Sequence, residues 1–586
     1  MKHVTAFPPS DADGKISRTS WKEWIWKQDS FCLFVLAFLL SLLLAICTPM
    51  PESDIARYGS IVASFTEGDW RMVFHPRISP LMPLLAGVVA TGTGAEPFFA
   101  LQLMSTLFFA LTIFPLYGIF RTCFSPLTVR IALLMAAFAS IPLRYGASGL
   151  RDSGKGFFYI LCVYLLVEVY RKRTDLKNYV FLGIAASLLA LTRTEAPVYA
   201  GMFGLSVLGL ELWRKKIVFP WRSCLCGLTA LLLLSPWLAF MYRTTGYPVP
   251  EIRYVPLIQK ILKPVEKPVS TLPPPARAVP EEKRVQQEKQ EQGRGESSRP
   301  ALPEPEKKSQ PLPSEKSVAG ESPLYQRTAQ HQNLNKVEEY EGFYKEFLSG
   351  VIGGFFPPLG IFALLGILLR IRSRKWTPEE SLVLAALLLH ALLLIVQIRV
   401  AGEHFYMSRR YLITVVALEF GWSAYGVLRL YEFLASRLEF LRRRWLIVLL
   451  FLIPCVSLYL YAFQRTIKTY TSRKKSAERI ALFSISDYIR KDYRGPDKFF
   501  RENSSLLEYQ TNRLPAVLCG FPQLGFLAGG QTVSFTDPLF ANGVLKPDYI
   551  IARPGEFPSG SLEAFGYRFR QSFSAGEERL ELFSRK

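Results

Sequence analysis

The sequence predicts a mostly α-helical, polytopic membrane protein with about eleven transmembrane helices and a small C-terminal α/β domain. Half of its 586 residues are hydrophobic and 13% are aromatic. Apolar runs long enough to cross a bilayer recur from Phe31 to Phe463. Only helices and closed barrels satisfy their backbone in lipid, and runs of this length favour helices. Beyond Phe463 the composition becomes that of a soluble domain.

The N-terminal segment, residues 1–30, is polar and basic, and the first apolar run, Phe31 to Thr48, follows it. A cleaved signal peptide would have a shorter leading region and an Ala-x-Ala site. A lipoprotein cleavage box at Leu44–Cys47 would need a small residue where Ile46 stands. We therefore expect an uncleaved signal anchor.

The remaining apolar runs and the charges between them predict the topology. The expected spans are about 31–49, 98–120, 129–144, 154–170, 178–192, 196–213, 223–241, 351–370, 380–398, 411–429 and 445–463. The formal net charge is +22, and the short loops on one side hold groups such as Arg171-Lys172-Arg173 and Arg442-Arg443-Arg444. Such loops are cytoplasmic by the positive-inside rule. The charge thus indicates topology and a lipid surface, and we expect no nucleic-acid partner.

This topology divides the chain into five parts. Residues 1–30 are a cytoplasmic segment, and 31–261 form an N-terminal transmembrane part with a first outer loop at 50–97. Residues 262–345 are rich in Pro, Glu, Lys, Gln and Ser, which predicts a disordered outer insertion because this composition buries little apolar surface. Residues 346–465 form a second transmembrane part. Residues 466–586 form the outer domain, with the site and this domain on the outer side of the plasma (inner) membrane.

The outer domain is expected to contain one helix and five strands. Apolar residues at helical spacing predict the helix over Ser476–Tyr493. The predicted strands are Ala516–Cys519, Thr532–Phe535, Tyr549–Ala552, Tyr567–Phe573 and Leu580–Phe583. Gly520, Gly529-Gly530 and Pro554-Gly555 supply turn signals between them.

The loop from Pro51 to Pro83 is the first candidate for an active site. Asp54, Arg57 and Tyr58 follow the first span directly, and in a helix they would share one face. Charges at the mouth of a membrane segment are costly unless they are paired or line a wet cavity. Asp54 could act as a general base towards a hydroxyl or amine. A purely structural pair of Asp54 and Arg57 is the alternative.

Further cations and aromatic residues fall at the same predicted face. Asp152 opens the fourth span with Arg151 and Lys155 beside it; capping of that helix by Asp152 or Ser153 is the alternative, and it is compatible with a functional role. Arginine on the outer side runs against the topological bias, and its planar fork suits phosphate oxygens. The candidate ligand-binding residues are Arg57, Tyr58, Arg77, Arg151, Lys155, Arg193, Arg243, Arg410 and Tyr411. For each single arginine, pairing with a carboxylate or capping of a helix is the alternative.

Cofactor signals are weak. His75, Glu403 and His404 lie in loops but show no recognisable ligand spacing, so a divalent metal is possible but not indicated. Phosphate-binding, dinucleotide and nucleophile-elbow motifs do not occur. The eight cysteines are scattered, most of them inside apolar runs, and they indicate no disulfide framework.

These motifs resemble the GT-C superfamily of integral-membrane glycosyltransferases, near the protein O-mannosyltransferase-like group and the bacterial transferase that adds aminoarabinose to lipid A. The resemblance covers roughly 50–250 and 350–465. It is carried by Asp54 with Arg57-Tyr58, Gly68-Asp69-Trp70, Ser79-Pro80-Leu81, Asp152, Thr192-Arg193-Thr194-Glu195, Ser235-Pro236-Trp237 and Arg410-Tyr411-Leu412. Two positions depart from the pattern: Ile55 stands where many members have Glu, and Ile78, after Arg77, stands where a Lys is common.

The resemblance implies transfer of a sugar from a polyprenyl phosphate to an acceptor on the outer side of the membrane, with inversion. Asp54 would be the general base and Asp152 would orient the acceptor or Arg57. A phosphate leaving group is stable as an anion, so it needs cations rather than a general acid. A transporter or flippase of lipid-linked sugars is the alternative, and Glu419 is the one strong mid-span charge that favours it. A receptor with an outer α/β domain is a third class.

Overall fold

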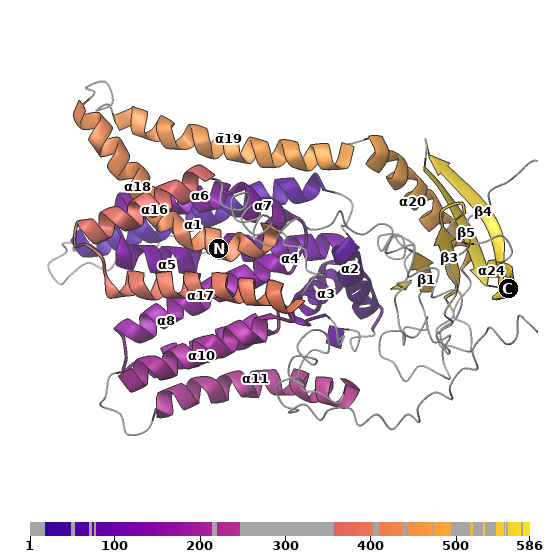
Figure 1. Ribbon diagram of the computed structural model, residues 1–586, viewed down its shortest axis with the longest axis horizontal. Helices are drawn as coiled ribbons and strands as arrows, with labels where there is room; N and C mark the ends of the chain where they lie inside the picture. The colour runs from indigo at the N-terminus through magenta and orange to yellow at the C-terminus, as the bar shows by residue number, and fades with distance from the viewer. Residues whose placement is uncertain are drawn as a thin grey trace, which may run out of the picture. The chain divides into compact units, whose positions relative to one another are not determined.

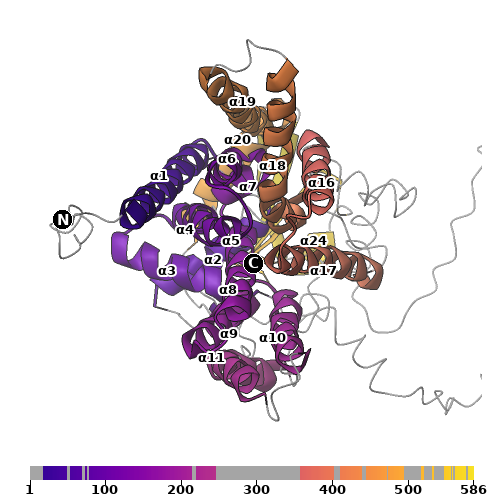
Figure 2. The same cartoon turned by 90° about the vertical axis from the view of Figure 1, so that its left-hand side faces the viewer.

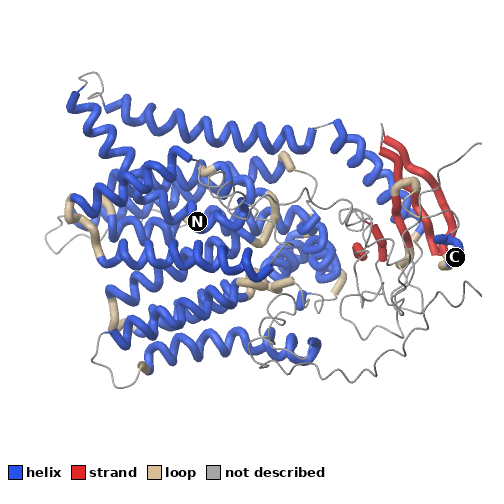
Figure 3. The backbone as a smooth tube through the Cα atoms, in the orientation of Figure 1, coloured by secondary structure: helices blue, strands red, loops and turns tan. Residues whose placement is uncertain are grey.

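The structure is a computed structural model, and it describes residues 18–48, 53–68, 73–74, 78–213, 220–245, 357–401, 409–437, 444–471, 473–493, 516–519, 531–533, 547–555, 557, 561–575 and 578–585. In this part the chain forms a bundle of helices and, near its C-terminus, a small sheet (Figures 1 and 3). The predicted insertion at 262–345 lies outside the described residues. Its disorder therefore stays a prediction.

The first half of the chain forms eleven described helices. They are α1 (Arg18–Ile46), α2 (Ser53–Thr66), α3 (Leu81–Thr93), α4 (Pro97–Leu111), α5 (Ile113–Cys123), α6 (Pro126–Phe138), α7 (Ser140–Ala147), α8 (Asp152–Arg171), α9 (Leu176–Ala190), α10 (Ala196–Trp213) and α11 (Trp221–Thr245). Local signals set several of these boundaries. Pro97 occupies the first turn of α4, and the Glu96 carboxylate accepts a hydrogen bond from Phe99 N at 3.0 Å.

The second half adds further helices to the bundle, and the last of them packs against the last two strands of the C-terminal sheet. These helices are α16 (Pro357–Arg372), α17 (Pro378–Ala401), the 3₁₀ turn η3 (Arg409–Leu412), α18 (Ile413–Arg437), α19 (Arg444–Thr471) and α20 (Arg473–Asp492). Thr377 and Glu380 form a reciprocal cap at the start of α17: Thr377 N donates to Glu380 Oε2 at 2.9 Å and Glu380 N donates to Thr377 Oγ1 at 3.3 Å.

The bundle is membrane-spanning by length and composition. Among the described residues, seven helices are long and apolar enough to cross a bilayer, or eight if α6 and α7, bent by 47°, count as one span. The expected span at 178–192 is α9, an apolar helix of only 15 residues. Leu81–Thr93 is another apolar helix too short to span. The count of eleven spans stays a prediction.

Two packing units organise the bundle. Helix α9 lies beside α8, α10 and α11, as the view in Figure 2 shows. In the second unit, glycine residues on α16 and α18 allow the backbones of these two helices to lie in close contact. A Cβ added at Gly366 would stand 2.1 Å from the Trp422 carbonyl oxygen, and one at Gly426 would stand 2.3 Å from that of Phe362. Small residues of this kind let helix backbones approach in membranes, where dispersion contacts drive association.

The C-terminal sheet has five strands, β1 (Ala516–Cys519), β2 (Gln531–Val533), β3 (Tyr549–Ala552), β4 (Tyr567–Ala575) and β5 (Glu578–Arg585). Their order is β2-β1-β3-β5-β4, with β1 parallel to both neighbours and β5 antiparallel to both of its neighbours. The short helix α24 (Ser561–Ala564) precedes β4. Each predicted strand is present, and the predicted helix corresponds to α20. That these elements form a separate outer domain stays a prediction.

Candidate active site

A buried group of charges surrounds the first turn of α8. Asp152 and Lys155 lie one turn apart on this helix and are 4% and 3% exposed. Arg193, in the turn between α9 and α10, reaches Asp152, with Arg193 Nη1 at 2.5 Å from Asp152 Oδ1. Isolated charges are costly in such a place, so each must be compensated by a partner or a ligand. The geometry therefore makes the start of α8 an ionic centre.

Glu195 completes this centre from the same turn as Arg193. Arg193 Nε approaches Glu195 Oε1 to 2.5 Å as an ion pair without hydrogen-bond geometry, and Lys155 Nζ stands 3.5 Å from the same oxygen. Burial by itself disfavours the charged carboxylate, but the charges of Arg193 and Lys155 lower the pKa of Glu195 to about 2. Glu195 is therefore ionised at neutral pH.

Aromatic rings bring two further elements to the centre. The Arg151 guanidinium carbon lies 4.4 Å from the ring centroid of Tyr58, a buried residue of α2. The ring centroid of Tyr411, in η3, lies 5.0 Å from the guanidinium carbon of Arg193 and 5.4 Å from that of Arg410. Such stacking holds a guanidinium in place while its edge remains available for hydrogen bonds. Elements α2, α8, η3 and the α9–α10 turn thus meet here.

His390, in α17, contacts the backbone of η3. Its Nε2 atom lies 3.4 Å from the Tyr411 carbonyl oxygen. The His390 ring stacks on Tyr199 and meets the Tyr159 ring edge to face, with both centroid distances 4.8 Å. Lys155 Nζ lies 4.5 Å from the centroid of the same Tyr199 ring. Packed aromatic residues therefore support the cationic centre.

Several polar atoms of this centre have no hydrogen-bond partner among the described residues. They are Arg151 Nε and Nη1, Asp152 Oδ2, Lys155 Nζ and Arg193 Nε. Buried polar groups are nearly always paired in folded proteins, so a concentration of unpaired ones identifies a place where a ligand or water supplies the missing partners. Four of these five atoms are cationic donors, which suits an anionic ligand.

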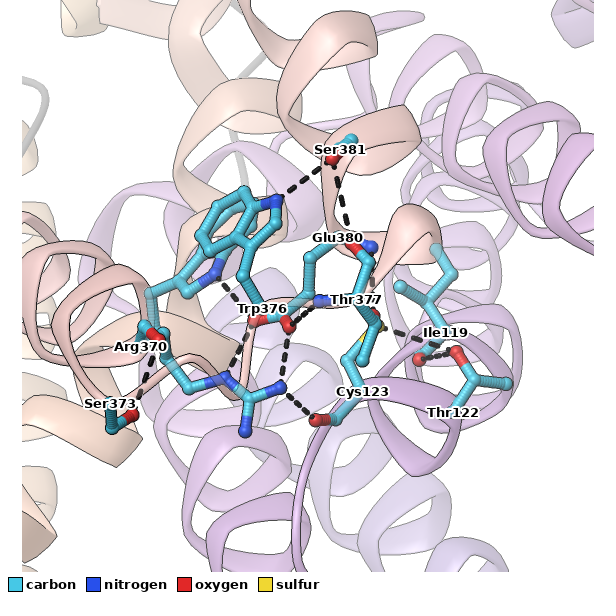
Figure 4. Close-up of polar contacts among 10 residues, drawn as sticks. Ile119, Thr122, Cys123, Arg370, Ser373, Trp376, Thr377, Glu380 and Ser381 are labelled. Carbon is cyan, nitrogen blue, oxygen red and sulfur yellow. Dashed lines mark hydrogen bonds and ion pairs between the residues drawn. The ribbon is translucent and has the colours of Figure 1, made fainter.

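A second buried charged group, between α16, α17 and α18, shows the opposite pattern (Figure 4). Arg370 donates from Nε to Glu380 Oε1 at 2.9 Å and from Nη2 to Glu380 Oε2 at 2.5 Å. Arg370 Nη2 also donates to the Cys123 carbonyl oxygen at 2.9 Å, and Trp422 Nε1 donates to Glu380 Oε1 at 3.2 Å. Both oxygens of Glu380 are thus paired within the protein. This group has a structural role, whereas the one at α8 retains unpaired donors.

The structure places the other predicted site residues as follows. Asp54 lies in α2, but its side chain is outside the described part of the chain, as is the whole of Arg77. Arg57 is exposed on α2, and its predicted pair with Asp54 is untested. Arg243 is exposed near the end of α11 and makes no described ion pair or hydrogen bond with the centre. The catalytic and binding roles of all these residues stay predictions.

Glu195 is the residue that the candidate set from the sequence lacks. From the Thr-Arg-Thr-Glu turn, the sequence-based set contains Arg193 alone. The signal for Glu195 is a carboxylate two positions after an outer arginine, in a turn between two spans. An arginine without another nearby carboxylate in the sequence indicates this Glu as its partner.

No metal centre is evident in the part of the chain that the structure describes, where no group of three His, Cys, Asp or Glu side chains could hold an ion. His75, Glu403 and His404 lie outside that part, so the possibility of a divalent metal is untested.

Comparison with known proteins agrees with this architecture. Residues 75–240 match the family model for dolichyl-phosphate-mannose-protein mannosyltransferase. ArnT from Cupriavidus metallidurans in the apo state is similar at a TM-score of 0.55 and 14% identity, over 96% of this chain and 98% of that one. The structure of ArnT from the same organism bound to undecaprenyl phosphate is similar at a TM-score of 0.55 and 14% identity, over 97% of this chain and 98% of that one.

A looser likeness links the chain to the oligosaccharyltransferase AglB from Archaeoglobus fulgidus in complex with an inhibitory peptide and a dolichol-phosphate. It has a TM-score of 0.49 and 14% identity, over 90% of this chain and 70% of that one. A search of the curated proteins gives no match. The resemblance drawn from the motifs is confirmed: residues 75–240 are similar to the dolichyl-phosphate-mannose-protein mannosyltransferase family, and the chain as a whole is similar in fold to ArnT.

Proposed function

We propose that the protein is a glycosyltransferase that moves a sugar from a polyprenyl-phosphate-linked donor to a lipid, glycan or protein acceptor. The reaction takes place on the outer face of the plasma membrane and inverts the anomeric centre. The start of α8 holds the donor phosphate, and the α2 segment supplies the base.

The observation that carries this proposal is the set of unpaired cationic donors at α8. Arg151 and Lys155 have polar atoms without hydrogen-bond partners among the described residues, and the one carboxylate near Lys155 Nζ, that of Glu195 at 3.5 Å, is shared with Arg193. Phosphate oxygens accept several charge-assisted hydrogen bonds at once. A phosphodiester therefore satisfies donors that the described side chains leave unpaired.

The chemistry follows from this arrangement. An acceptor hydroxyl or amine attacks the anomeric carbon from the face opposite the phosphate, and the bond between that carbon and the phosphate oxygen breaks. The bonding electrons leave with the polyprenyl phosphate, whose added charge Arg151 and Lys155 stabilise. The proton of the acceptor passes to the Asp54 carboxylate. Asp152, held through one oxygen by Arg193, orients the acceptor through the other.

The relatives support the nature of the donor. The family description names dolichyl-phosphate-mannose, and ArnT has been solved with undecaprenyl phosphate in a fold that covers almost the whole of this chain. Both compounds join a long isoprenoid tail to a monophosphate. We therefore place a lipid monophosphate, rather than a soluble nucleotide, at the start of α8.

The test compares two variants of the full chain at equal membrane abundance. Asp54→Asn removes the base, so transfer from tritiated polyprenyl-phosphate mannose to native membranes should fall by about a hundred- to ten-thousand-fold. Undecaprenyl phosphate binding should survive in that variant. Arg151→Ala should instead weaken undecaprenyl phosphate binding. Arg130→Ala, which removes an exposed cation paired with Asp29, is the matched control and should change neither quantity.

Near-normal turnover of the Asp54→Asn variant would show that Asp54 is not the general base, and Asp152 would then be the candidate for that role. Passage of intact donor across a vesicle membrane without loss of its sugar would replace the proposal with a transporter of lipid-linked sugars. Buried Glu419 is the mid-span acid in such a pathway, whereas Glu168 is held by Arg171 and Lys172 at 3.4 and 2.8 Å.

A further inference from the structure

A single amide side chain, that of Gln102 in α4, joins the ends of two other helices. Gln102 is 2% exposed. Its Nε2 atom donates to the carbonyl oxygens of Ala45 at 3.1 Å and Thr48 at 3.0 Å, to Thr48 Oγ1 at 2.8 Å, and to the carbonyl oxygen of Ala147 at 3.2 Å. Two N–H groups are thus shared among four acceptors on two segments.

The three carbonyl acceptors lie at or just after helix C-termini, where carbonyls lack their usual intrahelical partners, although that of Ala45 also accepts from Thr48 N at 3.0 Å and from Thr48 Oγ1 at 2.9 Å. Helix α1 ends at Ile46 and helix α7 ends at Ala147. Leaving a buried carbonyl unpaired is costly, and more so in a membrane, where no water replaces the donor. Gln102 therefore fixes the positions of both helix ends relative to α4 and to each other.

Neighbouring residues extend the junction towards the candidate site. Ser105, one turn further along α4, donates to the Leu150 carbonyl oxygen and to Ser153 Oγ, both at 3.1 Å, and so holds the start of α8. Gly149 adopts φ +81°, and a Cβ there would lie 3.4 Å from both Gln102 N and Ile55 Cγ2. The turn before α8 thus packs on α4 and on Ile55, the residue that follows Asp54 in α2.

The two segments held by Gln102 lead directly to the two predicted carboxylates. Asp54 stands six positions after Thr48, and Asp152 stands five positions after Ala147. We propose that Gln102 is a positioning residue, which sets the placement of the α2 segment relative to Asp152 and the bound phosphate. This inference rests on the proposed function for its effect on rate, but not for its effect on structure.

The test replaces Gln102 with methionine, which keeps the length of the side chain and removes its donors. A displacement of about 1 Å between catalytic groups costs on the order of a hundredfold in rate. We expect kcat for transfer from polyprenyl-phosphate mannose to fall by about that factor, while undecaprenyl phosphate affinity stays unchanged because Arg151 and Lys155 are intact. Hydrogen exchange of the α2 amides should also rise, with that of the α9 and α10 amides unchanged.

Thr106→Val is the matched control. Thr106 is buried on the same face of α4 and bonds to Ser41 of α1 at 3.2 Å, but away from the helix ends. It should affect thermal stability without a selective loss of kcat or faster exchange in α2. If Gln102→Met does not accumulate in membranes, Thr48→Val removes one of the four acceptors and should give a smaller change of the same kind.

Unchanged kcat and unchanged α2 exchange in Gln102→Met would overturn the inference, as would an equal loss in Thr106→Val. Faster α2 exchange in a protein whose wild type transfers no sugar would leave Gln102 as a positioning residue and reject the proposed function instead. The two failures are therefore distinguishable.

Discussion

One carboxylate, Glu195, keeps two buried cations in place at the candidate site. Its Oε1 atom lies within ion-pair distance of both Arg193 and Lys155. The pKa of Glu195 is lowered to about 2 from an ordinary value of 4.5. A carboxylate whose pKa is lower in the folded state stabilises the fold above its unfolded-state pKa and loses that contribution as the pH falls through its folded-state pKa. Its contribution is therefore complete above pH 4.5 and lost between pH 4.5 and 2.

We expect the thermal unfolding temperature of the purified protein in detergent to fall as the pH is lowered through this window. In Glu195→Gln the dependence should be weaker, because the titrating group is gone. At neutral pH the variant should be less stable than wild type by up to about 3 kcal/mol, the free energy equivalent of the shift.

Glu432→Gln provides the control, since Glu432 is 54% exposed and pairs with Arg429 on the surface of the same fold. It should leave the pH dependence as in wild type. An identical acid profile for wild type and Glu195→Gln would show that the ion pairs of Glu195 contribute no stability.

At the scale of residues, much of the candidate site is predictable from the sequence. Five of its residues fall on the same predicted face of the membrane, and the structure brings them together: Arg151, Asp152, Lys155, Arg193 and Tyr411. The pairings were not predictable, because they depend on side-chain directions across helices far apart in sequence. The stack of His390 on Tyr199 is one such contact, and the mid-span position of His390 gave no sign of it.

At the scale of elements, the close contact between α16 and α18 depends on glycine. Gly366→Ala would place a methyl group 2.1 Å from the Trp422 carbonyl oxygen, a backbone atom that cannot rotate away. Overpacking of this kind costs about 1–3 kcal/mol or more. We therefore expect a clear loss of thermal stability. Gly204→Ala in α10, where nothing lies within 4 Å, should be neutral or slightly stabilising.

The boundaries of the strands were predictable from the sequence, whereas those of the bent helix pair α6–α7 were not. Strands Ala516–Cys519 and Tyr549–Ala552 match the expected ranges because turn residues bracket short apolar runs. The expected span at 129–144 is instead two helices that meet at Ala139, whose ψ of 113° leaves the helical region. Ala139 carries no breaking signal itself, although Pro142 follows in the next turn.

At the scale of the whole molecule, the proposal requires one orientation in the membrane. The Lys and Arg content of alternate loops predicts a cytoplasmic N-terminus and an outer C-terminus. An alkaline phosphatase fused after Lys586 should therefore be active, and one fused after Arg374 should be inactive. The reverse result would place the ionic centre at α8 on the cytoplasmic side and reject the outer site.

The fold class was predictable from apolar runs alone, because length and hydropathy suffice to identify spans in lipid. The number of spans was not. Helix α9 is apolar but has only 15 residues, and the bent pair α6–α7 can be counted as one span. The periodicity of apolar residues does not reveal the bend at Ala139.

The closed pair of Arg370 and Glu380 bears on how this protein is made. The two residues are ten positions apart, at the end of α16 and the start of α17, and each would be costly to bring alone into the bilayer boundary. Because they pair within one hairpin, the nascent chain can neutralise them before α18 is synthesised. The charge pair of this hairpin thus needs no residue from the helices that follow it in the chain.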